Sequence, residues 1–284
     1  MYTPPHAIPL DQVTQQQIRL GIQGYGKTGK TSAALTFPNP IVVNLDRGLG
    51  AHIGRKDVVE LPFWSNEFCA KINSKHKNNS HIRDTLIQWL KSEGQKLEAD
   101  QTLVWDGGTG TQNAYHAWYD NNRVYSVKSG KEDEFAQWKL KIEFFAELCE
   151  EFKRLRCHVV YICHEADKKD KATGEYTGKI RPLLTGQFQD QLVSHFSDWV
   201  RQLTADKPAD FSKIQPETLY KWGFKTQAEF KEMCDKFPRN TIYFWQLESD
   251  DVFDGGVSSL VNFPRFIPAT YESFLKYSKH KQTT

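Results

Sequence analysis

The sequence predicts an α/β fold: a doubly wound, mainly parallel sheet flanked by helices, with an antiparallel extension formed late in the chain. Three observations support this prediction. A glycine-rich motif at residues 24–31 lies between a strand pattern and a helix pattern. Further short apolar segments end on polar or acidic residues, as buried parallel strands do at the edge where ligands bind. A last apolar segment, 241–247, follows a polar stretch interrupted by prolines.

Length and composition limit the possible classes of protein. The 284 residues suit one large domain or one domain with an insertion, and a net charge of +2 means that any contact with DNA needs a local basic patch. Five cysteines without Cys-x-x-Cys spacing indicate buried thiols in a reducing compartment. The N-terminus lacks the pattern of a signal peptide and no apolar run has membrane-spanning length, so we expect a cytoplasmic protein without membrane contact.

Changes in composition divide the chain into four parts. Residues 1–16 are rich in proline and glutamine and predict an N-terminal arm, followed by a core over 17–204. Residues 205–240 hold polar helical pieces bracketed by prolines and predict a helical insertion. Residues 241–284 predict strands and a short helix that complete the core.

The glycine-rich motif fits the P-loop pattern, because Gly24 and four further residues precede Gly29, Lys30 and Thr31. Its backbone amides would form an anion nest for a triphosphate, Lys30 would reach the β- and γ-phosphates, and the Thr31 hydroxyl would ligate Mg²⁺. The sequence thus predicts ATP and Mg²⁺ as cofactors. The residues expected to contact the nucleotide are Gly24, Tyr25, Gly26, Lys27, Thr28, Gly29, Lys30, Thr31 and Ser32.

The same pattern also fits three residues earlier, from Gly21 to Lys27 and Thr28. The flanking segments favour the later register. Alternation over 17–23 predicts a strand that ends at Gln23, and the residues from Lys30 onward predict a helix. The earlier register would cut this strand short and place Gly29 in the first helical turn, which weakens a helix.

Two strand ends supply candidate acidic residues. The apolar segment 41–43 is followed by Asp46, which is either a turn-forming aspartate or a carboxylate that orients and activates the attacking water. The segment 101–106 ends at Asp106, a Walker B aspartate that would hold Mg²⁺. Glycines follow Asp106 where some ATPases place a second acid, so Asp46 is the best-placed catalytic carboxylate.

A helix is predicted over 135–155 from apolar residues near a 3.6-residue period, and it leads into a buried strand over 157–163. This strand ends at His164 and Glu165. His164 is either a satisfied histidine beside a solvated glutamate or a polar group that senses the γ-phosphate. A helix and a strand are expected between residues 188 and 203.

Residues 167–181 predict a polar loop that carries basic side chains around an aromatic ring. Such a segment is either a solvated, charged hairpin or a contact for a single-stranded backbone and a stacked base. The candidate DNA-binding residues are Lys168, Lys169, Lys171, Tyr176, Lys179 and Arg181.

In this order of elements, the chain resembles RecA-like P-loop ATPases, and most of all the compact phage nucleotide-binding proteins that keep only the RecA core and work in recombination and single-strand annealing. The likeness spans most of the chain except about 50–100 and the 205–240 insertion. The segments that carry it are 24–31, 40–48, 103–107, 159–165 and 263–268.

The resemblance implies that Asp46 is the acid that activates water, that His164 is the sensor and that 167–181 is the second DNA-binding loop. Two departures affect these roles. An aspartate at position 46 replaces the commoner glutamate and shortens its reach, and Gly255-Gly256 stands where relatives often carry a basic residue that acts across a subunit interface. Arg239 and Arg265 are alternative candidates for that residue.

Together these features predict a RecA-like ATPase that couples Mg-ATP binding and hydrolysis to single-stranded DNA handling in phage recombination or replication. The expected partners are single-stranded DNA, a single-strand-binding or annealing protein and further copies of the chain in a ring or filament; a phage-encoded protein would act in the host cytoplasm. Two alternatives remain. One is a nucleotide-gated, partner-binding ATPase for helicase loading or DNA packaging, and the other is a small-molecule or nucleotide kinase.

Overall fold

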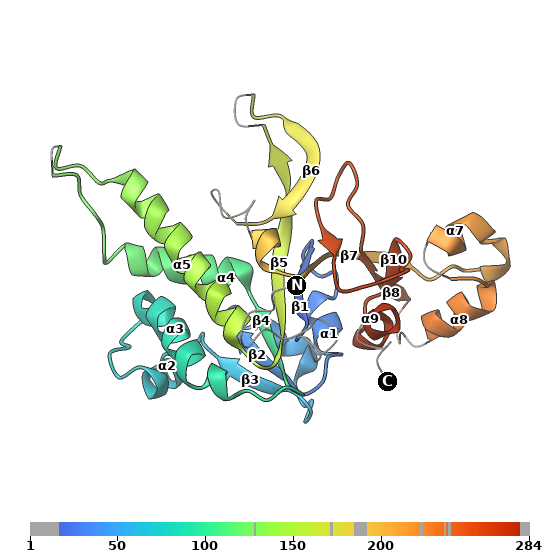
Figure 1. Ribbon diagram of the computed structural model, residues 1–284, viewed down its shortest axis with the longest axis horizontal. Coiled ribbons are helices and arrows are strands. Elements are labelled where there is room, and N and C mark those ends of the chain that lie inside the picture. The colour runs from blue at the N-terminus through green and yellow to red at the C-terminus, as the bar shows by residue number, and fades with distance from the viewer. Residues whose placement is uncertain are drawn as a thin grey trace, which may run out of the picture.

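The computed structural model describes residues 17–127, 129–170, 173–184, 192–221, 224–235, 237 and 240–278. The predicted arm, 1–16, lies outside these ranges. A ten-stranded sheet in the order β10-β8-β7-β1-β5-β4-β2-β3 forms the centre, with β6 paired to β5 and β9 to β7 (Figure 1). This arrangement confirms the predicted fold class.

Neighbouring strands from β7 to β3 run parallel. Their carboxyl ends therefore meet at one edge of the sheet, where predicted site residues of four strands lie: Gly24 of β1, Asp46 just after β2, Asp106 of β4 and His164 of β5. These strands are β1 (Arg19–Gly24), β2 (Pro40–Asn44), β3 (Val59–Pro62), β4 (Thr102–Asp106), β5 (His158–Lys169) and β7 (Asp198–Asp206).

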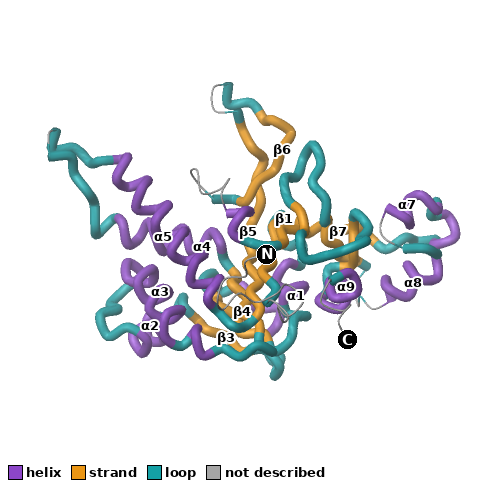
Figure 2. Tube along the Cα trace, in the orientation of Figure 1, coloured by secondary structure: helices purple, strands orange, loops and turns teal. Residues whose placement is uncertain are grey.

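The remaining strands are antiparallel to their neighbours and form the predicted late extension and one hairpin. Figure 2 shows the long hairpin of β5 and β6 standing out from the sheet. The antiparallel strands are β6 (Tyr176–Pro182), β8 (Thr241–Gln246), β9 (Gly256–Val257) and β10 (Phe266–Pro268).

Helices cover both faces of the sheet, because side chains alternate along each buried strand. On β4, Leu103 and Trp105 pack with α3, α4 and α5, whereas Val104 packs on the opposite face with α1 and α9. A separate small core joins α7 and α8 to β8. The helices are α1 (Lys30–Ala34), α2 (Asn66–Ile72), α3 (Ile82–Ser92), α4 (Gly108–Tyr119), α5 (Glu134–Arg154), α7 (Pro216–Lys221), α8 (Gln227–Asp235) and α9 (Tyr271–Tyr277).

The structure corrects the polar loop expected at 167–181. β5 does not end at His164 but continues to Lys169, and the chain returns as β6 in antiparallel pairing. Backbone pairing across the hairpin, such as Glu165 with Pro182, overrides the polar composition that favoured a loop. Lys171 lies outside the described residues.

Two further elements were not expected. The glycines after Asp106 lie at the start of helix α4, because Gly107 turns the chain at a φ of 132° and α4 then buries Tyr115 against Phe144 of α5. Strand β3 was also not predicted from the sequence. Of the helix expected after residue 188, the described part contains only a 3₁₀ turn at Leu192–His195, and 185–191 lie outside the described residues.

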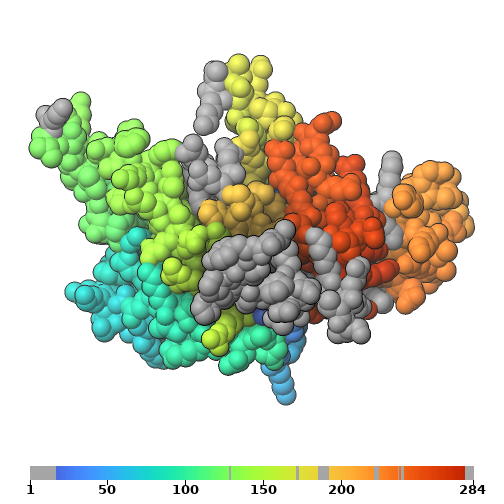
Figure 3. Space-filling model, viewed as in Figure 1, coloured from blue at the N-terminus to red at the C-terminus, as the bar shows by residue number. Residues whose placement is uncertain are grey.

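Three segments project from the body of the molecule. In the space-filling view these are the β5–β6 hairpin (yellow), the connection between α4 and α5 (green) and the α7–α8 segment (orange) (Figure 3). α5 begins on the projecting green segment, and this explains why Phe135 and Trp138, two of the apolar residues whose period predicted this helix, are exposed. None of the described helices is long and apolar enough to cross a membrane.

Candidate functional site

The P-loop connects the end of β1 at Gly24 to the start of α1 at Lys30, as the later of the two registers requires. Gly29 has a left-handed φ of 78°, which favours glycine because a Cβ would be strained there. Gly26 and Lys27 are exposed at the tip of the loop. The Thr28 hydroxyl donates to the Tyr25 carbonyl over 2.9 Å and closes the loop on itself.

Lys30 is buried, and its ammonium donates to the carbonyls of Gly24 and Tyr25 over 2.8 and 2.6 Å. These bonds fix the charge inside the loop, whereas the Lys27 side chain is exposed. Burial lowers the pKa of Lys30, although the nearby Asp106 and Glu165 carboxylates act in the opposite direction. The lysine of the later register is thus the one that the fold buries at the loop.

Thr31 and Asp106 meet from different elements, since the Thr31 hydroxyl on α1 donates to Asp106 Oδ2 at the end of β4 over 2.8 Å. A hydroxyl and a carboxylate are oxygen donors suited to Mg²⁺, so these two residues fit the ion that P-loop ATPases usually take. Within the described residues, no group of three His, Cys, Asp or Glu side chains could hold a metal alone. A bound ion would therefore share its coordination with phosphate and water.

Asp46 lies beside the start of α4, and this position explains two of the glycines after Asp106, Gly107 and Gly110. A Cβ on Gly107 would lie 3.2 Å from Asp46 Oδ2, and one on Gly110 only 2.6 Å from Asp46 Oδ1. Directly after Asp106, where some ATPases place a second acid, this chain has glycines that accommodate the carboxylate of Asp46, two residues beyond β2. Burial raises the pKa of Asp46, and His164 opposes that shift.

His164 also lies at this site, since its Nδ1 is 3.5 Å from Lys30 Nζ. An ammonium has only donors, so this contact requires an unprotonated Nδ1 and leaves the proton on Nε2. Burial, followed by the charge of Lys30, lowers the pKa of His164. The imidazole is therefore neutral near pH 7 and can offer an N–H donor to an anion.

The structure contains a buried ion pair that the sequence analysis did not predict, since a solvated Glu165 was one of the two alternatives left open there. Its side chain is fully buried and accepts a forked pair of hydrogen bonds from Arg201 of β7, at 3.0–3.2 Å. Gln23 Nε2 on β1 lies 3.4 Å from the same carboxylate. The pair ties β5 to β7 across β1, and alternation along β5, which points Glu165 away from His164, was the available signal.

The candidate DNA-binding residues that the structure describes, all but Lys171, lie on the hairpin. Lys169 stacks over the ring of Tyr176 at 4.8 Å, and Tyr176 is exposed, whereas Lys179 pairs with Asp254 at 3.6 Å. The hairpin also touches the P-loop, since the Tyr25 hydroxyl donates to Asp167 over 3.2 Å. The hairpin and the P-loop are therefore in direct contact.

The remaining candidates for a subunit-spanning arginine are not placed at this site. Arg239 lies outside the described residues, and Arg265 is paired with Asp250.

Ser32, the last residue expected to contact the nucleotide, is exposed on α1, and its hydroxyl lies 3.4 Å from His52 Nε2.

Comparison with known proteins gives one family match. The family described as "AAA domain" matches residues 16–237. No curated protein matches the chain. Among solved structures, the chain is similar to the assembled ATPase EscN in complex with its central stalk EscO from the enteropathogenic E. coli type III secretion system, at 10% identity and a TM-score of 0.35. The match covers 78% of this chain and 53% of that one, so this chain spans about half of its length.

Proposed function

Since the chain belongs to the AAA domain family and is a P-loop ATPase, we propose that it couples ATP hydrolysis to the handling of single-stranded DNA in recombination or replication. The observation that carries this proposal is the continuity of β5. One strand runs from His164, 3.5 Å from the P-loop lysine, to Lys169 on the basic hairpin. A change at the phosphates can therefore reach the hairpin without an intervening loop.

In the proposed reaction, the P-loop amides and Lys30 bind the phosphates, and Thr31 and Asp106 hold Mg²⁺, which when bound neutralises charge on the phosphate oxygens. Asp46 orients the attacking water and accepts its proton. His164 donates from Nε2 to the γ-phosphate and loses that contact after hydrolysis. Catalysis is then mostly positioning and charge stabilisation.

The hairpin supplies the chemistry for a single strand. Its basic side chains neutralise phosphates without reading sequence, and an exposed tyrosine offers a face for a base. The Tyr25–Asp167 hydrogen bond provides a second link from the P-loop to the hairpin. We further propose that copies of the chain assemble in a ring or filament on the strand, where a single-strand-binding or annealing protein also acts. The five cysteines are buried free thiols, which fits a reducing cytoplasm, that of the host for a phage-encoded protein.

The test is steady-state ATP turnover with and without a single-stranded oligonucleotide. Wild type should turn over faster with DNA, Lys30→Ala should lose turnover, and Lys27→Ala, the matched control in the same loop, should change little. Turnover indifferent to DNA would refute the coupling and leave the ATPase in place. Phosphate transfer to a nucleoside or nucleotide would favour a kinase instead, and the reverse ranking of the two lysines would overturn the P-loop register.

A second candidate, nucleotide-gated binding of a protein partner in helicase loading or packaging, is favoured by the projecting segment between α4 and α5. Tyr125 and Val127 are exposed there, with Val127 fully open to solvent, and Phe135 is exposed in the adjoining first turn of α5. Exposed apolar side chains on a projection are typical of protein contacts. ATP turnover that ignores DNA but responds to a co-purified protein, and loses that response in Val127→Asp, would support this candidate.

A further inference from the structure

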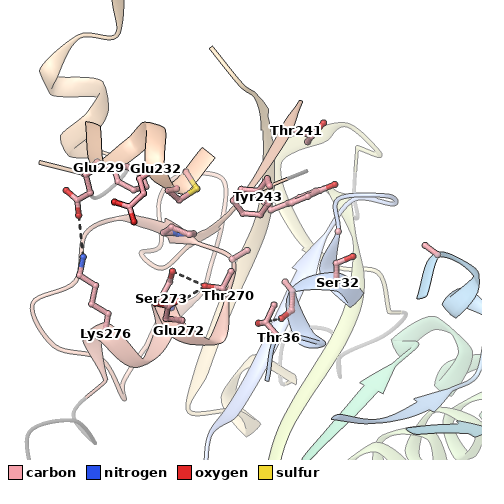
Figure 4. Close-up of a pocket in the computed structure, with 18 of the residues that line it drawn as sticks. Ser32, Thr36, Glu229, Glu232, Thr241, Tyr243, Thr270, Glu272, Ser273 and Lys276 are labelled. Atoms are coloured by element: carbon pink, nitrogen blue, oxygen red, sulfur yellow. Dashed lines mark hydrogen bonds and ion pairs between the residues drawn. The ribbon is translucent and has the colours of Figure 1, made fainter. Parts of the chain in front are cut away.

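A cavity of about 720 Å³ adjoins the P-loop, and Asp106 is not among the residues that line it. Figure 4 shows its walls, which come from α1, β8, α8 and α9. Two of its residues, Gly29 and Ser32, also belong to the predicted phosphate loop. A ligand that places its phosphates in the loop can therefore extend its remaining atoms into this cavity without leaving the protein surface.

Tyr243 of β8 forms the wall nearest to the P-loop. Its ring lies so close to Gly29 that a Cβ there would stand 2.7 Å from it. Phe237 packs edge-on against the same ring, with centroids 5.7 Å apart, and holds its orientation. An aromatic ring fixed beside the phosphate loop offers a stacking surface for a planar base.

The polar lining of the cavity suits hydrogen-bond donors rather than phosphate. Glu232 of α8 and Glu272 of α9 line it, while the ammonium of Lys276 lies 3.6 Å from Glu229 and is partly neutralised. Carboxylates repel a triphosphate but accept hydrogen bonds from ribose hydroxyls and from an exocyclic amino group. The charges of the two regions therefore favour binding of the phosphates at the P-loop and of the nucleoside in the cavity.

α8 and α9 are held together over this cavity. The Lys276–Glu229 ion pair joins the two helices, and the Thr36 hydroxyl at the end of the P-loop helix accepts from the Tyr271 amide at the start of α9 over 2.8 Å. The walls thus connect the P-loop helix to the segment expected as an insertion, 205–240.

We propose that this cavity binds the nucleoside half of ATP, with the base against Tyr243 and the donors of the ribose and base toward Glu232 and Glu272. The inference rests on the proposed nucleotide binding at the P-loop and adds a site for the base. It also assigns a role to the 205–240 segment, because α8 forms one wall of the nucleotide site.

The test compares equilibrium binding of Mg-ATP with that of Mg-tripolyphosphate, which has the phosphates but no nucleoside. Wild type should bind ATP at least tenfold more tightly than tripolyphosphate. Tyr243→Ala should weaken ATP about tenfold, because stacking on an aromatic ring is lost, and leave tripolyphosphate unchanged. Tyr243→Phe should bind both as wild type does. Tyr220→Ala, which removes an exposed tyrosine of α7 outside the cavity, is the matched control.

Tripolyphosphate binding also reports that each variant is folded, since it needs an intact P-loop. Equal affinity of wild type for the two ligands, or unchanged ATP binding by Tyr243→Ala, would overturn the nucleoside site and leave the P-loop assignment standing. An equal loss of both ligands in Tyr243→Ala would show that the ring only supports the loop, and would also overturn the inference. A wild type that binds neither ligand would overturn the proposed function itself.

Discussion

Replacing Arg201 with methionine should destabilise the fold by about 3–5 kcal/mol, because it leaves the Glu165 carboxylate buried without its cation. The Glu165 side chain is 0% exposed and that of Arg201 is 15% exposed, so water cannot replace the lost partner. Arg201 supplies a forked pair of bonds at 3.0–3.2 Å, and among the described residues Gln23 Nε2, at 3.4 Å, is the other side-chain donor bonded to the carboxylate. Methionine keeps most of the side-chain volume, so the loss of stability reports the removal of the charge rather than the formation of a cavity.

The assay is reversible urea unfolding of Arg201→Met, Glu165→Gln and the double variant. The double variant should be more stable than Arg201→Met by at least about 2 kcal/mol, because a neutral amide costs less to bury than an unpaired carboxylate. Lys153→Met is the matched control. It breaks the 2.7 Å ion pair with Glu150, whose side chains are 46% and 54% exposed, and should cost less than about 1 kcal/mol.

Two results would refute this reasoning. One is a loss in Arg201→Met no larger than in Lys153→Met, which would mean that the buried pair is as well solvated as a surface pair. The other is a double variant no more stable than the single one, which would mean that the arginine stabilises through packing rather than through its charge.

Three further outcomes follow from the site. Asp46→Asn should lower kcat about 100-fold with little change in ATP affinity; because the pKa of Asp46 is raised, wild-type kcat should fall on acidification at a higher pH than for an ordinary carboxylate, and a pH–rate profile of both proteins checks this. Gly110→Ala should also lower kcat, because its Cβ would stand 2.6 Å from Asp46 Oδ1; a variant as active as wild type would remove Asp46 from this position. Alanine at three lysines of the 167–181 segment should weaken single-strand binding and reduce the number of counterions released on binding by up to about three, and an unchanged salt slope would remove this segment from the DNA path. These lysines are Lys168, Lys169 and Lys171.

Local pattern was sufficient for the elements whose interactions are close in sequence. The P-loop register follows from the alternation before Gly24 and the helix after Lys30, and both are present in the structure. The buried strands ending near Asp46 and Asp106 were also predictable, because a short apolar run closed by a polar residue is typical of a parallel sheet. The sequence by itself thus determined the α/β fold class, the strand–loop–helix arrangement around residues 24–31 and the polar residues at which the buried strands end.

Contacts between distant segments decided the rest. The order of strands brings Asp46 against Gly110 and sets Glu165 opposite Arg201, and neither proximity can be read from spacing along the chain. The polar composition of 167–181 predicted a loop, whereas cross-strand pairing makes this segment part of the β5–β6 hairpin. The start of α4 was not predicted, because it lies in a run of glycines where Gly107 turns the chain. The cavity beside Tyr243 exists only because β8, α8 and α9, all late in the chain, fold back onto the P-loop helix. The sequence fixes the type of each side chain and the local spacing of apolar residues. Which side chains are buried and which charges are paired depends on which elements become neighbours in the sheet.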